Sequence, residues 1–166
     1  ESAKMVAREQ LEFTRKLVAR FSRPSNVAAP IDLAQAQYIA IITLLRSIGH
    51  VFEKVDCDSP AKKQWSKSMW SEWKKEPIFS EFIDPTRNKL LKEFRGGLSI
   101  KSGVFGSPAV TFDAASPDMV GMQGWLNPDE IIDPDGRKVM PQIKEAIEFW
   151  DRKLRDADTA FRALPQ

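Results

Sequence analysis

The chain has 166 residues, of which 42% are hydrophobic and 29% charged, which is typical of a globular domain rather than a disordered segment. One cysteine and one histidine exclude an internal disulfide framework, a cysteine-based zinc site and a multi-histidine metal centre, so we expect neither metal nor cofactor. No apolar run approaches the roughly 18–20 residues of a membrane span, and the first residues lack a hydrophobic signal segment; we therefore expect no membrane contact and a cytoplasmic location. The length predicts one domain, residues 1–166.

Apolar residues at helical spacing dominate the first third of the chain. Phe13, Leu17 and Phe21 recur every four residues and predict an amphipathic helix over 2–22, with these side chains on its buried stripe. The next segment, 32–56, is apolar around most of its circumference. That pattern is typical of the central helix of a bundle.

The remaining elements are marked by prolines, glycines and further helical periodicity. Ser59-Pro60 predicts the start of a helix that runs to about residue 76. Asp84-Pro85 either caps a new helix or kinks a continuous one, and the helix that follows is predicted to run to residue 94. A last helix is predicted over 141–163. Residues 98–140 hold many glycines and short alternating runs, which predict a loop-rich insertion carrying short β-hairpins. The predicted fold class is therefore mainly α, a helical bundle with this insertion.

One polar stripe remains on the predicted central helix, and Arg46 and His50 lie one turn apart in it. Arginine binds phosphate bidentately, and histidine serves as a general acid or base near neutral pH. The structural alternative is that both residues line a packing seam and bond to neighbouring side chains.

A second polar group lies on the predicted helix over 84–94. Asp84, Asn88 and Lys92 follow one another at four-residue spacing, with Arg87 and Arg95 alongside. An Arg-Asn pair on a helix can hold a phosphate or a ribose. The structural alternative is that Arg87 pairs with a carboxylate, such as Asp84, and fixes the kink at the adjoining proline.

Basic residues concentrate between residues 60 and 101, which hold ten basic and five acidic side chains. Such a local excess suits a polyanionic partner, although a solvated helix surface has the same composition. Trp65, Trp70 and Trp73 alternate with lysines in this stretch, so they either stack bases or pack in the core.

The order of these features over residues 5–97 resembles the HEPN superfamily of helical proteins, and in particular its bacterial members. The resemblance is carried by the end of an alanine-rich helix, a tryptophan-rich segment and a polar helix: Leu45-Arg46-Ser47-Ile48, Trp65 to Trp73, and Phe82-Ile83-Asp84 leading into Arg87-Asn88-Lys89-Leu90-Leu91-Lys92-Glu93.

Active members of this superfamily are metal-independent ribonucleases whose two copies meet across a dimer. The resemblance implies that Arg87 and Asn88 begin their catalytic motif, which continues to a histidine on the same helix. Here Lys92 stands at the histidine position. With an ordinary pKa of about 10.4, lysine is a poor general base at neutral pH.

Three functions follow from these features. The preferred one is a non-catalytic HEPN-like module that binds a partner protein or nucleic acid, as a homodimer, with Arg46, His50, Asp84 and Arg95 as binding residues. The second is a metal-independent endoribonuclease of toxin or defence type, with Arg87, Asn88 and Lys92 as its catalytic residues and with His50, from a different helix, as the alternative to Lys92. The third is a helical bundle that binds a small molecule in a pocket lined by Arg46 and His50.

Overall fold

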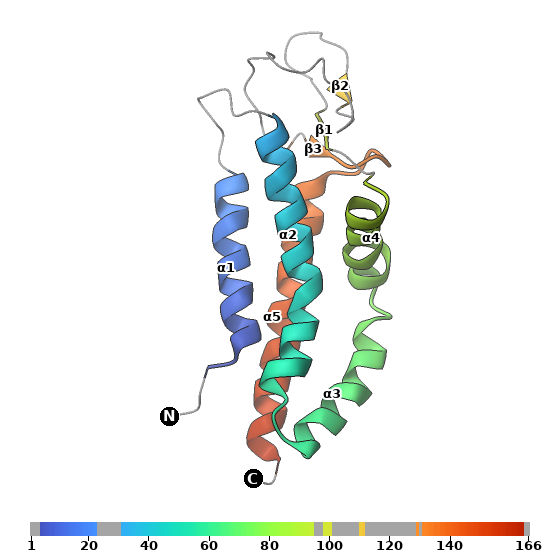
Figure 1. Cartoon of the computed structure of the whole chain (residues 1–166). Helices are drawn as coiled ribbons and strands as arrows, with labels where there is room; N and C mark the ends of the chain where they lie inside the picture. Colours follow the sequence, from blue (N-terminus) through green and yellow to red (C-terminus); the bar gives the residue numbers. More distant parts are fainter. Residues whose placement is uncertain are drawn as a thin grey trace.

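The computed structural model describes residues 4–22, 31–94, 98–100, 110–111, 129 and 131–164. Their backbone is mainly helical, as predicted, and its α-helices are α1 (Val6–Phe21), α2 (Ile31–Val51), α3 (Pro60–Trp73), α4 (Asp84–Lys92) and α5 (Val139–Ala163). Figure 1 shows α1, α2 and α5 side by side, with α3 and α4 on the other side of α2. No helix in these residues is long and apolar enough to cross a bilayer.

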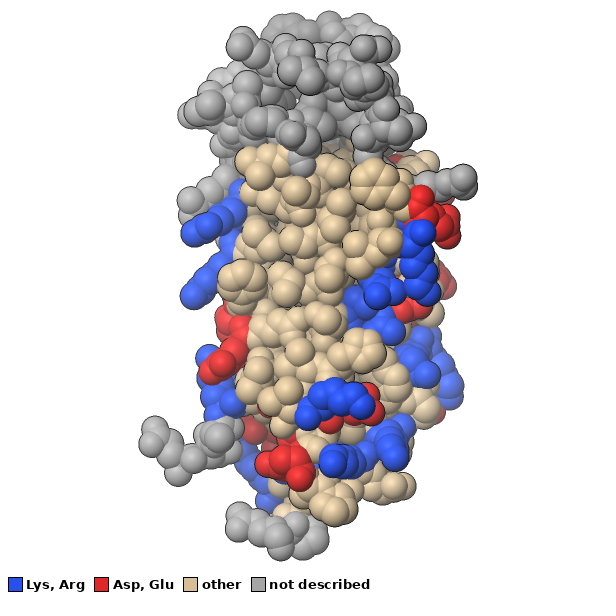
Figure 2. Space-filling model, viewed as in Figure 1, with Lys and Arg blue, Asp and Glu red and all other residues tan. Residues whose placement is uncertain are grey.

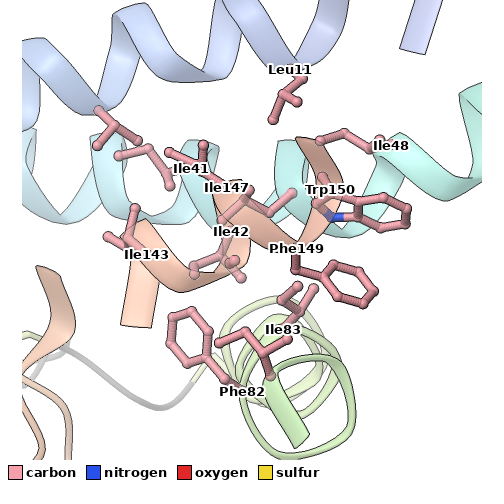
Figure 3. Close-up of a cluster of buried hydrophobic side chains, with 14 of the residues drawn as sticks. Leu11, Ile41, Ile42, Ile48, Phe82, Ile83, Ile143, Ile147, Phe149 and Trp150 are labelled. Atoms are coloured by element: carbon pink, nitrogen blue, oxygen red, sulfur yellow. The ribbon is translucent and has the colours of Figure 1, made fainter. Parts of the chain in front are cut away.

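α2 is the central helix, and its buried side chains form much of the core. Ile41, Ile42, Leu45 and Ile48 are fully buried, and Phe52, just beyond the helix, is 1% exposed. Figure 3 shows isoleucines of α2 facing those of α5, with a phenylalanine and an isoleucine from the segment before α4 closing the cluster. The predicted burial of Leu45, Ile48 and Phe52 is confirmed.

α1 buries part of the predicted stripe: Phe21 is buried and Leu17 packs against the core, but Phe13 does neither. Phe13 is 58% exposed, and the buried side chains repeat at alternating spacings of four and three residues: Ala7, Leu11, Thr14, Val18 and Phe21. That alternation follows the 3.6-residue helical period, whereas a strict four-residue repeat drifts around the helix. Phe13 lies at the start of such a drifting repeat and therefore faces away from α2 and α5.

Two π-helical segments continue or precede the α-helices. η1 (Phe52–Asp56) extends α2, so the two together cover the helix predicted over 32–56. η2 (Ile78–Ile83) runs directly into α4, and Asp84 at their junction has helical backbone angles. Asp84-Pro85 therefore lies inside one helical run and does not cap a new helix. α3 ends at Trp73, three residues before the predicted end.

Asp56, the last residue of η1, caps α1 from a distance in sequence. Its two carboxylate oxygens accept the backbone N–H groups of Val6 and Ala7 at 2.8 and 2.9 Å. These N–H groups have no partner inside the helix, and a carboxylate also suits the positive end of the helix dipole. This contact fixes where α1 begins.

The described parts of 98–140 include three short strands, β1 (Ser99–Ile100), β2 (Val110–Thr111) and β3 (Ile131–Ile132). They form an antiparallel sheet in the order β2-β1-β3. Leu98 and Ile131 belong to the hydrophobic core, so the ends of the segment are not separate from the helices. Val139 and Met140, which the predicted insertion included, are instead buried in the first turn of α5. The rest of the insertion lies outside the described residues.

Candidate functional site

The structure brings the two predicted polar groups together where α2 packs against α4. The Arg46 Nε–H donates to Asp84 Oδ1 at 2.5 Å, which links the two helices by an ion pair. The two residues are 38 positions apart in sequence. Their side chains are 21% and 38% exposed, so the pair sits at the edge of the core.

Further hydrogen bonds extend this pair along both helices. Arg46 Nη1 lies 3.2 Å from His50 Nε2, and because arginine has no acceptor, the imidazole nitrogen is the acceptor of this contact. On α4, Asn88 Nδ2 donates to Asp84 Oδ2 at 3.3 Å, and Arg87 Nη1 donates to Asn88 Oδ1 at 3.1 Å. We call His50, Arg46, Asp84, Asn88 and Arg87 the polar cluster.

Aromatic rings hold the guanidinium of Arg46 in place. Its Cζ lies 5.3 Å from the ring centroid of Phe79 and 5.9 Å from that of Trp70, which are cation–π distances. Arg46 is thus engaged by a carboxylate, an imidazole and two rings. This residue positions the cluster, and little of its charge remains for a ligand.

Arg87 has the opposite character. Asp84 is paired with Arg46, so the alternative that Arg87 braces the kink through Asp84 is wrong. Within the described residues Arg87 forms no ion pair, and its hydrogen bond to Asn88 uses one of its five N–H donors. The side chain is half-buried. Arg87 is therefore the cation of the polar cluster whose other N–H donors have no partner among the described residues.

The other predicted site residues fall outside this network. Lys92 is exposed one turn beyond Asn88 and forms no ion pair with the part of α4 or its neighbours that the structure describes. Arg95 lies outside the described residues. His50 is exposed at the surface, whereas a small-molecule pocket requires Arg46 and His50 to line an enclosed cavity.

The tryptophans support the cluster as core residues. Trp73 is 1% exposed and packs edge-on against Trp65 and Trp150, so it is closed to a nucleic-acid base. Trp70 is half-buried and stacks on Trp150 with 6.4 Å between ring centroids. The packing alternative therefore holds for Trp73. The ring of Trp70 packs against the guanidinium of Arg46.

Gly49 allows Trp70 to take that place. A Cβ atom at Gly49 would lie 2.7 and 2.8 Å from two carbons of the Trp70 ring, closer than real Cβ contacts. Sequence reasoning missed Gly49 and Phe79 as parts of the site, and it did not connect Trp70 with Arg46. The available signal was an isolated glycine inside an otherwise apolar helix, which often marks a close approach.

The remaining reactive groups offer no second centre. Cys57 is buried, and burial raises the pKa of its thiol to about 11, so it is a poor nucleophile near neutral pH. In the described ranges no three His, Cys, Asp or Glu side chains gather as metal ligands.

The polar cluster thus combines the Arg46–Asp84 ion pair, an exposed imidazole and an arginine that has no ion pair among the described residues. Such a group can hold an anion at Arg87, with Asn88 as a neighbouring hydrogen-bonding group. Comparison with known proteins adds no relative, since no family model, curated protein or solved structure matches the chain.

Proposed function

We propose that this chain is a non-catalytic HEPN-like module that binds RNA through the polar cluster, acting as a homodimer. The observation that carries the proposal is that the two arginines of the polar cluster make different contacts. Arg46 satisfies Asp84, which leaves the guanidinium of Arg87 without a carboxylate partner in the described structure. An unpaired arginine beside an asparagine amide suits a phosphate and an adjacent ribose hydroxyl.

The RNA class and the absence of catalysis are supported by the resemblance noted from the sequence. Arg87 and Asn88 match the start of the ribonuclease motif, and Lys92 replaces its histidine. Lysine stays protonated at neutral pH, so it contributes a charge for phosphate and no general base.

The test replaces Arg87 with glutamine and measures the binding of a fluorescent single-stranded RNA. Loss of charge-assisted hydrogen bonds worth about 1.5–3 kcal/mol lowers affinity about 10- to 100-fold. Stability changes by less than about 0.5 kcal/mol, because no ion pair is lost. Arg20→Gln is the matched control, since Arg20 is an exposed α1 residue without a described ion pair. Equal affinities for the two variants, or unfolding of Arg87→Gln, would overturn the assignment.

The ribonuclease alternative is favoured by one observation, the presence of His50 in the same hydrogen-bonded network as Arg87 and Asn88. A histidine from α2 would then replace the one missing from α4 and take the proton of the attacking 2′-hydroxyl. Incubating the protein with RNA and a metal chelator separates the two functions. Cleavage that His50→Ala abolishes and Lys92→Ala leaves intact would establish the enzyme, and intact RNA supports the binding module.

The dimer is proposed across the outward face of α2. From Leu33 to Leu45 this helix carries no charged residue, and Figure 2 shows a broad uncharged surface in the middle of this face. Ala36 is exposed there. Ala36→Glu is therefore expected to shift the chain from dimer to monomer in sedimentation experiments while its helical circular dichroism is unchanged. A wild-type chain that sediments as a monomer at high concentration would refute the dimer.

A further inference from the structure

A stripe of unpaired lysines runs along one edge of α3. Lys63 and Lys67 lie within the helix and Lys74 directly follows it, at spacings of four and seven residues. At 100° per residue these three positions fall within about 40° of one another around the helix axis. All three are exposed and form no ion pair with the described residues. We call them the α3 lysine stripe.

The exposed face of α3 has no acidic side chain left to neutralise this stripe. Glu72 is engaged by the ammonium of Lys75 at 2.8 Å. Asp58, just before the helix, holds Lys62 at 2.8 Å. The two acids nearest the stripe are thus committed to other lysines.

The stripe also opposes the stability of its own helix. Lys63 and Lys67 are like charges four residues apart, an arrangement that weakens a helix. The first turn of α3 contains no acidic residue, although acids are favoured at the positive end of a helix dipole. A bound polyanion removes both penalties. No contact within the described structure does so.

Trp70 connects the α3 lysine stripe to the polar cluster. It lies three residues after Lys67 and four before Lys74, which places it on the same edge of α3. Its ring lies beneath the guanidinium of Arg46, which is bonded to Asp84 on α4. Figure 2 shows Lys and Arg side chains gathered over α3 and α4, beside the uncharged middle of the face.

We propose that the α3 lysine stripe extends the RNA-binding surface, so that one strand of RNA lays its phosphates along this edge of α3 and reaches Arg87 past Trp70. This inference rests on the proposed function and adds the path and extent of the ligand. The stripe measures about 16 Å from Lys63 to Lys74 along the helix axis. A repeating anion suits it because its three charges are exposed and the neighbouring acids, Asp58 and Glu72, are paired with other lysines.

The test compares the salt dependence of binding to a single-stranded oligouridine. The variant Lys63→Gln/Lys67→Gln/Lys74→Gln removes three phosphate contacts. The slope of log K against log salt concentration, measured between about 50 and 200 mM salt, becomes shallower by about 2, since each contact on a single strand contributes about 0.7. The control variant Lys4→Gln/Lys16→Gln/Lys144→Gln loses the same net charge from exposed positions on other parts of the molecule. It is expected to keep the wild-type slope to within about 0.7.

The outcomes separate this inference from the function on which it rests. If the two triple variants have equal slopes while Arg87→Gln still loses affinity, the stripe is not part of the site and the proposed function stands. A wild-type chain without affinity for oligouridine overturns both. If polyglutamate competes as well as RNA of equal charge, the stripe recognises acidic protein and the RNA assignment is wrong. Circular dichroism checks folding, and Lys67→Gln alone, with a slope change of about 0.7, replaces the triple variant if that one unfolds.

Discussion

Replacing Gly49 with alanine adds one methyl group between two tryptophan rings, and we expect the change to destabilise the protein. The new Cβ would lie 2.7 and 2.8 Å from Cζ3 and Cη2 of Trp70 and 3.0 Å from Cη2 of Trp150. Trp150 is fully buried, and Trp70 stacks on it and meets Phe79 edge-on with 5.3 Å between ring centroids. These contacts oppose a shift of either ring, although Trp70 is only half-buried.

Two effects of opposite sign determine the size of the change. Alanine favours a helix interior over glycine by about 1 kcal/mol. Overpacking a filled core costs about 1–3 kcal/mol. Because the clash involves the fully buried ring of Trp150 as well as that of Trp70, we place the overpacking near the upper end of that range. The free energy of unfolding then falls by about 1–2 kcal/mol, which lowers the Tm by about 2–8 °C for a chain of this size.

The assay is urea denaturation followed by circular dichroism, with Trp70→Phe as a second background. Phenylalanine lacks the outer ring carbons that clash with the new methyl group. In this background Gly49→Ala is expected to be neutral or slightly stabilising, a coupling of about 1–2 kcal/mol between the two positions. If Gly49→Ala stabilises the wild-type chain, or costs the same in both backgrounds, the steric explanation is wrong.

Three further predictions concern the core, a helix cap and pH. Leu45→Ala is expected to lower the free energy of unfolding by about 2–5 kcal/mol, because Leu45 is fully buried; a loss below about 1 kcal/mol in urea would contradict the packing. Asp56→Ala is expected to lower the free energy of unfolding by about 1–2 kcal/mol, because it removes the acceptor of two N–H groups of α1. Faster amide hydrogen exchange confined to the start of α1 would identify this cause. Burial raises the pKa of Cys57 to about 11, so the folded chain keeps its thiol proton where the unfolded chain loses it. Stability therefore falls as pH rises from about 9 towards 11, a decline that Cys57→Ala should reduce.

Local sequence patterns were sufficient to locate most helices and the residues of the candidate site. The apolar spacing of α2 identified Leu45 and Ile48 as core residues, because a helix repeats its buried face every three to four residues. Ser59 and Pro60 located the start of α3, where the Ser59 hydroxyl accepts the Lys62 N–H at 3.3 Å. These signals depend on neighbours within one or two turns, and such neighbours are visible in a sequence.

The pairing of charges was decided by the tertiary structure. Arg87 lies three residues from Asp84, yet Asp84 bonds to Arg46 from another helix. Packing of α2 against α4 brings Arg46 over the rings of Phe79 and Trp70, where a partly desolvated guanidinium gains most from a carboxylate. Spacing along one helix carries no information about that second helix.

Close contacts across helices were likewise beyond the reach of periodicity. Phe13 was placed on the buried stripe because it begins a four-residue repeat, but that repeat drifts around α1 and leaves Phe13 exposed. Asp56 gave no sign that its carboxylate would cap a helix begun 50 residues earlier in the chain. The sequence specifies which residues can form a helix and which polar side chains need a hydrogen-bonding partner. The packing of whole helices selects the partner, because only that packing brings residues distant in the chain within bonding distance.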